Sequence, residues 1–163
     1  MSATAKKTET TLDVGSPAPA FSLPDETGTT RSLNDFKGQK VVLYFYPKDD
    51  TPGCTMEAKD FAAKHAEFVQ AGAVILGVSK DNQSKHDKFK CKYNLPFSLL
   101  SDTEGEACAA YGVWAQKSMF GKKYMGIQRA TFLIDADGTI AKIWPKVKVT
   151  GHASDVLKAV KAL

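Results

Sequence analysis

Runs of apolar residues divide the chain into segments that predict the strands of a sheet. The stretches VVLYFY (41–46), AVILGVS (73–79) and FSLLS (97–101) are apolar on both faces, which is typical of strands buried inside a sheet. Short strands around 20–23 and 28–32 are expected to pair as an N-terminal hairpin, because the ETGTT sequence supplies turn residues. We therefore expect a buried central sheet with a small hairpin ahead of it.

Apolar residues at helical spacing fill the gaps between these strands. Over 51–72 they return every three or four residues, and Gly72 ends the pattern. The next helix is expected to begin at Asp81 or Asn82 and to end at Tyr93. Strands that alternate with helices in this way predict an α/β fold with a central, mostly parallel sheet.

The C-terminal part of the sequence predicts shorter elements around a long loop. Asp102 can cap a short helix over 103–111, whereas residues 112–126 show little periodicity and are expected to form a loop. ATFLID and TIAKIWP, joined by the turn DADG, predict an antiparallel hairpin at the edge of the sheet. Ser154 can cap a final amphipathic helix.

Length and composition are those of one globular domain. The chain has 163 residues, of which 43% are hydrophobic and 25% charged, so it can bury a core and is not disordered. No apolar run approaches the roughly 20 residues that span a bilayer, and the opening MSATAKKTET lacks the apolar stretch of a secretory signal. We expect a flexible tail over 1–12, a single domain over 13–163, and a cytoplasmic protein that does not bind membranes.

Charge and cysteine content exclude several classes of function. The net charge of +4 comes from scattered basic residues, of which only Arg31 and Arg129 are arginines, so no nucleic-acid partner is expected. The three cysteines, Cys54, Cys91 and Cys108, are too few and too widely spaced for a disulfide scaffold or a zinc cluster. We expect no metal site, and no cofactor because the chain carries no flavin, haem or nicotinamide motif.

Cys54 is the strongest candidate for chemistry. It follows a buried strand and the polar turn KDDTPG, at the first turn of a predicted helix, where a core cysteine would be out of place. Unpaired N–H groups and the dipole at a helix N-terminus favour an anion such as a thiolate. The helix end contributes only about 0.3–1 kcal/mol, which is too little to ionise an ordinary thiol at pH 7. A nearby guanidinium is therefore expected, and the chain offers only two.

The residues around Cys54 also resemble a known family. YFYPKDDTPGCTMEA places Pro47, Thr51 and Cys54 in the spacing P-x-x-x-T-x-x-C, which is similar to the active-site signature of the peroxiredoxins. GSPAPAFSLPDETG, ILGVSKD, SLLSD, YGVW and FLIDADGTI extend the resemblance over 13–163, to the bacterioferritin comigratory protein (PrxQ) subgroup. The resemblance implies a thioredoxin-like fold, a hydroperoxide substrate, a thioredoxin or similar dithiol as reductant, and a monomer.

The resemblance implies a role for each residue of the signature. Cys54 would attack the terminal oxygen of the peroxide and become a sulfenic acid. Thr51 would hydrogen-bond the thiolate and the peroxide through its hydroxyl. Pro47 would shield the sulfenic acid from water.

Further residues would support this chemistry. Arg129 resembles the distant arginine of the family that binds both thiolate and substrate, and the backbone N–H groups of Gly53 and Cys54 would stabilise charge on the departing oxygen. Glu57 matches a glutamate that orients the arginine. A glutamate in the first turn of a helix is also favoured by the helix dipole alone, so this role has a simple structural alternative.

The thiol that resolves the sulfenic acid is less clear from the resemblance. Some relatives carry a second cysteine five residues after the first, where this chain has Lys59, and others carry it directly after a phenylalanine on the next helix. Here Phe89 is followed by Lys90 and only then by Cys91, about 200° around the helix from Phe89, so Cys91 is expected to be exposed. Cys108, among alanines, is expected in the core. We expect Cys91 to resolve the sulfenic acid after local unwinding, with a one-cysteine cycle finished by an external thiol as the alternative.

Two other functions remain to be compared with a peroxidase. A thiol–disulfide oxidoreductase on the same fold would need a C-x-x-C pair, which TPGCTMEA lacks, and a proline ahead of the strand facing the site, where the chain has QRATF. A non-catalytic binding or chaperone module would not require the full set of Pro47, Thr51, Cys54 and Arg129. The sequence favours the peroxidase.

Overall fold

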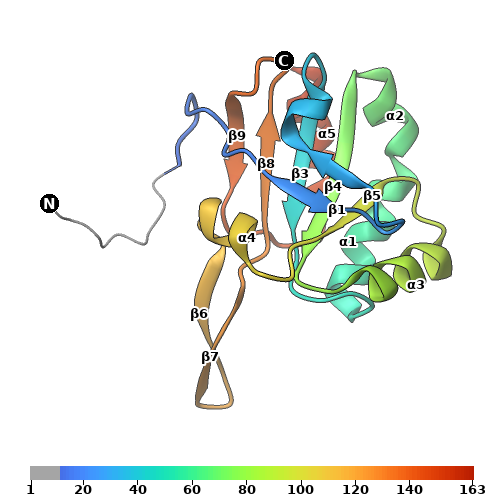
Figure 1. Cartoon of the computed structure of the whole chain (residues 1–163). Coiled ribbons are helices and arrows are strands. Elements are labelled where there is room, and N and C mark those ends of the chain that lie inside the picture. The colour runs from blue at the N-terminus through green and yellow to red at the C-terminus, as the bar shows by residue number, and fades with distance from the viewer. Residues whose placement is uncertain (1–11) are drawn as a thin grey trace, which may run out of the picture.

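The computed structural model describes residues 12–163, and at its centre is a five-stranded sheet with the strand order β5-β4-β3-β8-β9 (Figure 1). β3, β4 and β5 are parallel, whereas β8 is antiparallel to β3 and β9 is antiparallel to β8. The strands are β3 (Lys40–Phe45), β4 (Ala73–Ser79), β5 (Ser98–Ser101), β8 (Ala130–Ile134) and β9 (Ile140–Trp144). This mixed sheet with flanking helices confirms the predicted fold class.

Helices and a small hairpin cover the two faces of the sheet (Figure 1). One face packs against α1, α2, α3 and α5, and the other against α4, the 3-10 helix η2 and the hairpin of β1 and β2. The helices are α1 (Pro52–Ala63), α2 (His65–Gln70), α3 (Gln83–Tyr93), α4 (Glu106–Ala110), α5 (His152–Lys161) and η2 (Leu33–Phe36). β1 (Ser22–Pro24) and β2 (Thr30–Ser32) are antiparallel, so the expected N-terminal hairpin is confirmed.

The structure does not describe most of the segment that was expected to be an N-terminal tail. The tail predicted over 1–12 falls outside the described residues, apart from Leu12, whose partly buried side chain packs against the sheet face that α4 covers. Among residues 12–163, no helix combines the length and the apolar character needed to cross a bilayer.

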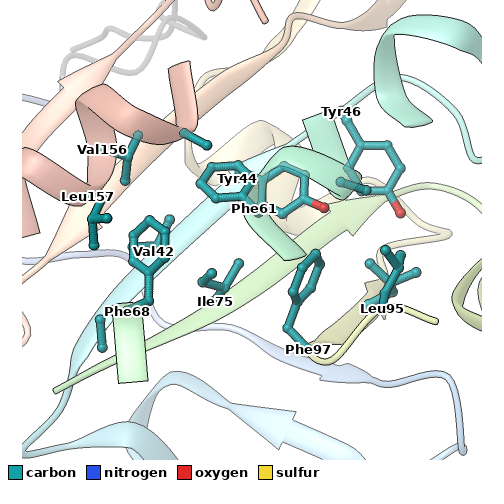
Figure 2. Close-up of a cluster of buried hydrophobic side chains, with 14 of the residues drawn as sticks. Val42, Tyr44, Tyr46, Phe61, Phe68, Ile75, Leu95, Phe97, Val156 and Leu157 are labelled. Atoms are coloured by element: carbon teal, nitrogen blue, oxygen red, sulfur yellow. The ribbon is translucent and has the colours of Figure 1, made fainter. Parts of the chain in front are cut away.

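β3 supplies the middle of the core, because successive side chains of a strand point to opposite faces of the sheet. The ring of Tyr44 stacks on that of Phe61 with centroids 4.8 Å apart, and it meets the Phe97 ring edge-on at 6.0 Å. Figure 2 shows this cluster, in which Val156 and Leu157 of α5 also take part. The buried strand predicted from VVLYFY is confirmed, and it leads the chain directly toward Cys54.

The prediction of a loop over 112–126 is wrong, because this segment forms a second antiparallel hairpin. β6 (Trp114–Met119) pairs with β7 (Lys122–Ile127), and the hairpin projects from the body of the molecule (Figure 1). Phe120 and Gly121 connect the strands with φ values of 52° and 79°, a left-handed pair typical of tight hairpin turns. Because most of this hairpin is exposed on both faces, it lacks the alternation of apolar and polar residues that marks a half-buried strand.

The prediction of one continuous helix over 51–72 is also wrong. The helix breaks at Lys64, whose φ and ψ of −107° and 7° are not helical, and the two halves become α1 and α2. α1 packs against α5, and α2 packs against both β4 and α5. His65, at the break, is half-buried.

Two predicted helix caps differ from the structure in position. The last helix begins at His152 after Gly151, ahead of the residues that Ser154 would cap, and the bond between His152 Nε2 and Thr131 Oγ1 (2.8 Å) anchors this earlier start. α4 is shorter than expected and follows Gly105, but the Asp102 carboxylate still accepts hydrogen bonds from two N–H groups of its first turn.

The predicted cap of α3 is confirmed. It is Asn82, whose side chain accepts a hydrogen bond from Lys85 N at 2.9 Å.

Gly77 in β4 leaves no room for a side chain, which predicts a measurable cost for Gly77→Ala. An added Cβ would lie 2.9 Å from Cζ of the buried Tyr44 and 3.0 Å from Cδ2 of Leu99. We expect the free energy of unfolding in urea to fall by about 1–3 kcal/mol. Gly126→Ala is the control, because its Cβ would lie 3.3 Å from the ring of the exposed Tyr124 and 3.4 Å from Cδ of Lys117, and its change should stay within about 0.5 kcal/mol. Equal losses in both variants would contradict the tight contact.

Candidate active site

The candidate site forms where the end of β3 meets the start of β8. Phe45 pairs with Ala130 in the antiparallel register of these strands, so Arg129, the residue before Ala130, lies beside the chain that leaves β3. α1 begins a few residues after β3, with Thr51 as its N-cap, and carries Cys54 in its first turn. The sheet therefore brings together two residues from distant parts of the sequence.

The guanidinium of Arg129 lies between a thiol and a carboxylate. Its Nη2 is 3.4 Å from Sγ of Cys54, and its Nη1 donates to Oε1 of Glu57 at 2.7 Å. Cys54 and Glu57 are almost fully buried, at 2% and 1% exposure. Burial opposes the charge of Arg129, but Glu57 and Cys54 outweigh it and raise the pKa of the guanidinium above its usual range. A permanent positive charge thus contacts the Cys54 sulfur.

The backbone at the start of α1 adds further positive character. The first helical hydrogen bond runs from Thr55 N to the Thr51 carbonyl (2.8 Å), so the N–H groups of Gly53 and Cys54 precede it and face the end of the helix. A Cβ on Gly53 would lie 3.1 Å from Nη2 of Arg129, which explains why glycine fits here. Together the N–H groups and Arg129 can stabilise a thiolate or a departing oxyanion.

Thr51 and Pro47 lie in the loop that leads to Cys54. The Thr51 hydroxyl donates to the Lys48 carbonyl at 2.9 Å rather than to Cys54. Its proton is therefore engaged, and the hydroxyl oxygen can only accept hydrogen bonds from other groups. Pro47 is exposed and lies two residues after the end of β3. Both residues share one short loop with Cys54, and their roles toward a peroxide stay predictions.

Two buried polar atoms lie next to this site without a hydrogen-bond partner among the described residues: Oε2 of Glu57 and the hydroxyl of Tyr44. Burial raises the pKa of Glu57 to about 7, and the guanidinium of Arg129 lowers it only in part. Burial, followed by the charges of Glu57 and Cys54, holds the pKa of Tyr44 well above its usual range. Tyr44 is thus a neutral hydroxyl at neutral pH, whereas Glu57 changes its charge there.

The other two cysteines differ in environment. Cys91 is exposed on α3, with its Sγ 3.8 Å from Oδ1 of Asp87, which confirms its predicted exposure. Cys108 is fully buried, as predicted, and burial together with Asp102 raises the pKa of its thiol far above its usual range. Cys108 is therefore unreactive in the folded protein.

One cluster near the site was not found from the sequence. Asp49, Asp81 and His86 bring one carboxylate or imidazole atom each within 4.8 Å of one another. His86 contacts Oδ2 of Asp49 through Nδ1 (2.6 Å) and the Leu100 carbonyl through Nε2 (2.9 Å). Asp81 accepts from Ser79 Oγ (2.7 Å) and Asp49 N (2.8 Å), so hydrogen bonds within the protein already engage these groups. The sequence did contain a signal for this cluster, because Asp49 and Asp81 each follow the carboxyl end of a parallel strand, and such ends meet at the same edge of a sheet.

Comparison with known proteins agrees with this geometry. Residues 14–143 match the family model described as AhpC/TSA family. The chain belongs to this family. A putative peroxiredoxin bcp of Coxiella burnetii is 56% identical over 146 residues, which cover 90% of this chain and 97% of that protein. Peroxiredoxin Bcp of Bacillus subtilis is 52% identical over 151 residues, covering 93% and 96%.

Solved structures of AhpC/TSA relatives show the same fold. Peroxiredoxin Q of Xanthomonas campestris superposes with a TM-score of 0.86 at 45% identity, covering 94% of this chain and 97% of that one. A cysteine-to-serine variant of PrxQ from Xylella fastidiosa gives a TM-score of 0.88 at 38% identity, with 93% and 96% covered. The peroxiredoxin family, the thioredoxin-like fold and the class of thiol-dependent peroxidase that the residues around Cys54 predicted are therefore confirmed.

The position of Arg129 predicts that it controls the reactivity of Cys54. In Arg129→Gln the sulfur loses its cation, and we expect alkylation of Cys54 by iodoacetamide at pH 7 to slow about ten-fold, since charged hydrogen bonds contribute about 1.5–3 kcal/mol. Mass spectrometry of the Cys54 peptide measures the rate. Arg31→Gln is the control, because Arg31 pairs with Asp25 in the N-terminal hairpin (2.8 Å). An unchanged rate in Arg129→Gln would contradict the assignment.

The raised pKa of Glu57 predicts a pH-dependent stability. Folding keeps a proton on Glu57 that the unfolded chain releases near pH 4.5, so this stabilisation is complete below about 4.5 and is lost as the pH rises to about 7. The free energy of unfolding of the wild type, relative to Glu57→Gln, should fall by up to about 3 kcal/mol over that window. Urea titrations from pH 4 to 8 measure it. If the free energy of unfolding of the wild type, relative to Glu57→Gln, instead rises with pH, the pairing of Glu57 with Arg129 outweighs its burial.

Proposed function

We propose that the chain reduces hydrogen peroxide and organic hydroperoxides at Cys54, in the reducing environment of the cytoplasm. The observation that carries the proposal is the guanidinium of Arg129, 3.4 Å from Sγ of Cys54 at the N-terminus of α1. A solved structure of the Xanthomonas campestris relative is described as bearing on its alkyl peroxide reduction activity, which supports organic hydroperoxides as substrates. The chain needs no cofactor for this chemistry, because the sulfur itself is oxidised.

The first step is a displacement at oxygen. The Cys54 thiolate attacks the terminal oxygen of the peroxide, the S–O bond forms and the O–O bond breaks. The departing alkoxide or hydroxide takes a proton and leaves as an alcohol or water, and Cys54 becomes a sulfenic acid. Arg129 and the N–H groups of Gly53 and Cys54 stabilise the charge on the departing oxygen. The Thr51 hydroxyl oxygen accepts a hydrogen bond from the peroxide, and Pro47 shields the product from water.

The second step is resolution by Cys91. Its thiolate attacks the sulfenic sulfur of Cys54, forming the S–S bond and breaking the S–O bond, and the hydroxide leaves as water after taking a proton. Cys91 is exposed, whereas Cys108 is fully buried. The Xanthomonas campestris peroxiredoxin Q has been solved as serine variants of two different cysteines, which supports a cycle with two cysteines. A thioredoxin or similar dithiol then reduces the disulfide of the monomeric protein.

Peptide mapping of peroxide-treated protein tests this cycle. We expect a tryptic peptide that links Cys54 to Cys91 after one equivalent of peroxide, and no peroxide consumption in Cys54→Ser. Cys91→Ser should form the sulfenic acid at the wild-type rate but no intramolecular disulfide. Cys108→Ser is the control and should behave as the wild type. A Cys54 sulfenic acid that stays unlinked in the wild type would support the one-cysteine cycle, and unchanged turnover in Cys54→Ser would reject the site.

A further inference from the structure

The end of α3 that carries Cys91 is held by bonds to two other segments. Lys90 donates to Oε2 of Glu26 at 3.0 Å, and Lys92 donates to Oδ2 of Asp50 at 2.9 Å. The Tyr93 hydroxyl donates to the other oxygen of Asp50 at 2.8 Å. The residues on both sides of Cys91 are therefore fixed to elements outside the helix.

Asp50 belongs to the loop between β3 and α1, the same loop that leads to Cys54. Its backbone is in the left-handed region with φ of 58°, which is uncommon for a residue other than glycine. The hydrogen bonds from Lys92 and Tyr93 lower the pKa of its carboxyl, so it is ionised and paired at neutral pH. The preceding residue, Asp49, also binds α3, through His86. Two consecutive aspartates thus attach the active-site loop to the helix of Cys91.

Formation of a Cys54–Cys91 disulfide requires this attachment to open. Cys54 is buried beside Arg129, whereas Cys91 is exposed and its sulfur lies near Asp87, one turn back on its own helix. A buried Cys54 and an exposed Cys91 on different helices can form a disulfide, whose Cα atoms lie about 4.4–6.8 Å apart, only if one of the two segments moves. The movement that the proposed cycle calls for is unwinding of the last turn of α3, where Cys91 lies. Unwinding there moves Lys92 and Tyr93, the neighbours of Cys91, away from Asp50.

We propose that Asp50, by binding Lys92 and Tyr93, is a positioning residue that sets the rate at which Cys91 reaches the Cys54 sulfenic acid. The inference rests on the proposed role of Cys91 as the resolving thiol. Asp50 lies in the loop that leads to Cys54, so its bonds to Lys92 and Tyr93 hold the end of α3 against the active-site loop. This attachment slows the step that follows the reaction with peroxide.

The rate of resolution decides how much of the enzyme is overoxidised. A sulfenic acid that waits for its resolving thiol can react with a second peroxide, which transfers an oxygen to the sulfur to form a sulfinic acid and leaves as water or an alcohol. A firmer attachment of α3 therefore gives more sulfinic acid at a given peroxide concentration, and a weaker one gives less.

The double variant Lys92→Met/Tyr93→Phe tests the proposal from the helix side, leaving the active-site loop unchanged. Rapid acid quench and mass spectrometry measure the formation of the sulfenic acid and of the disulfide separately. We expect disulfide formation to be about two- to five-fold faster, as the loss of one exposed ion pair and a hydrogen bond allows. Sulfenic acid formation should keep the wild-type rate, and less sulfinic acid should form at high peroxide.

Lys88→Met is the matched control. It removes one positive charge from the exposed surface of α3, and Lys88 forms none of the ion pairs found among residues 12–163. Its disulfide should form at the wild-type rate. Salt gives a second readout, because screening weakens an exposed ion pair. Disulfide formation should accelerate more with salt in the wild type than in the double variant, which keeps the Lys90–Glu26 pair.

The outcomes separate this inference from the proposed function. If the wild type forms no Cys54–Cys91 disulfide, the two-cysteine cycle fails and the inference fails with it. If the disulfide forms but the double variant resolves at or below the wild-type rate, the cycle stands and the role of Asp50 is overturned. An equal acceleration in Lys88→Met would also overturn it, since the effect would then come from charge on the helix in general.

Discussion

The contact between Arg129 and Cys54 is the interaction on which the rest of the site depends. A thiol at the end of a helix gains too little from the helix alone to be largely ionised at neutral pH, so the guanidinium must be brought to it from elsewhere in the chain. The antiparallel register of β3 and β8 does this by setting Ala130 beside Phe45. Burying the cation costs desolvation free energy, which Glu57 offsets by accepting a hydrogen bond from Nη1 of Arg129. The central sheet therefore also positions Arg129 beside Cys54.

The sequence predicted the parts of the structure that bury apolar residues. β3, β4 and β5 were visible because apolar residues fill both faces of a strand inside a sheet, and the helices between them followed from their spacing. Cys54 was visible because a cysteine after a polar turn is unusual for a core residue. The small number of arginines left only two candidates, and the resemblance to the peroxiredoxins pointed to Arg129, although its contact with Cys54 depends on strand register, which no local pattern encodes.

The features that the sequence did not reveal depend on exposure or on distant partners. The β6–β7 hairpin has few buried side chains, so its strands show no alternation, and its Phe120–Gly121 turn differs from the Asn-Gly pairs that usually mark such turns. Phe61 of α1 and Phe68 of α2 are buried in the same core cluster, so the apolar spacing continues across the break at Lys64 and does not reveal it. Asp49, Asp81 and His86 come from three separate segments, and only the assembled sheet edge brings them together.

The buried Glu26 has a consequence for biosynthesis. Its carboxylate accepts from the backbone N–H of Leu99 at 3.0 Å as well as from Lys90, so the partners that Glu26 has within residues 12–163 are made much later than Glu26 itself. On the ribosome, this acidic group emerges long before either partner exists, and until then it must stay hydrated. The N-terminal hairpin therefore reaches its final packing only after β5 has left the ribosome, even though it is the first regular element of the described chain to be translated.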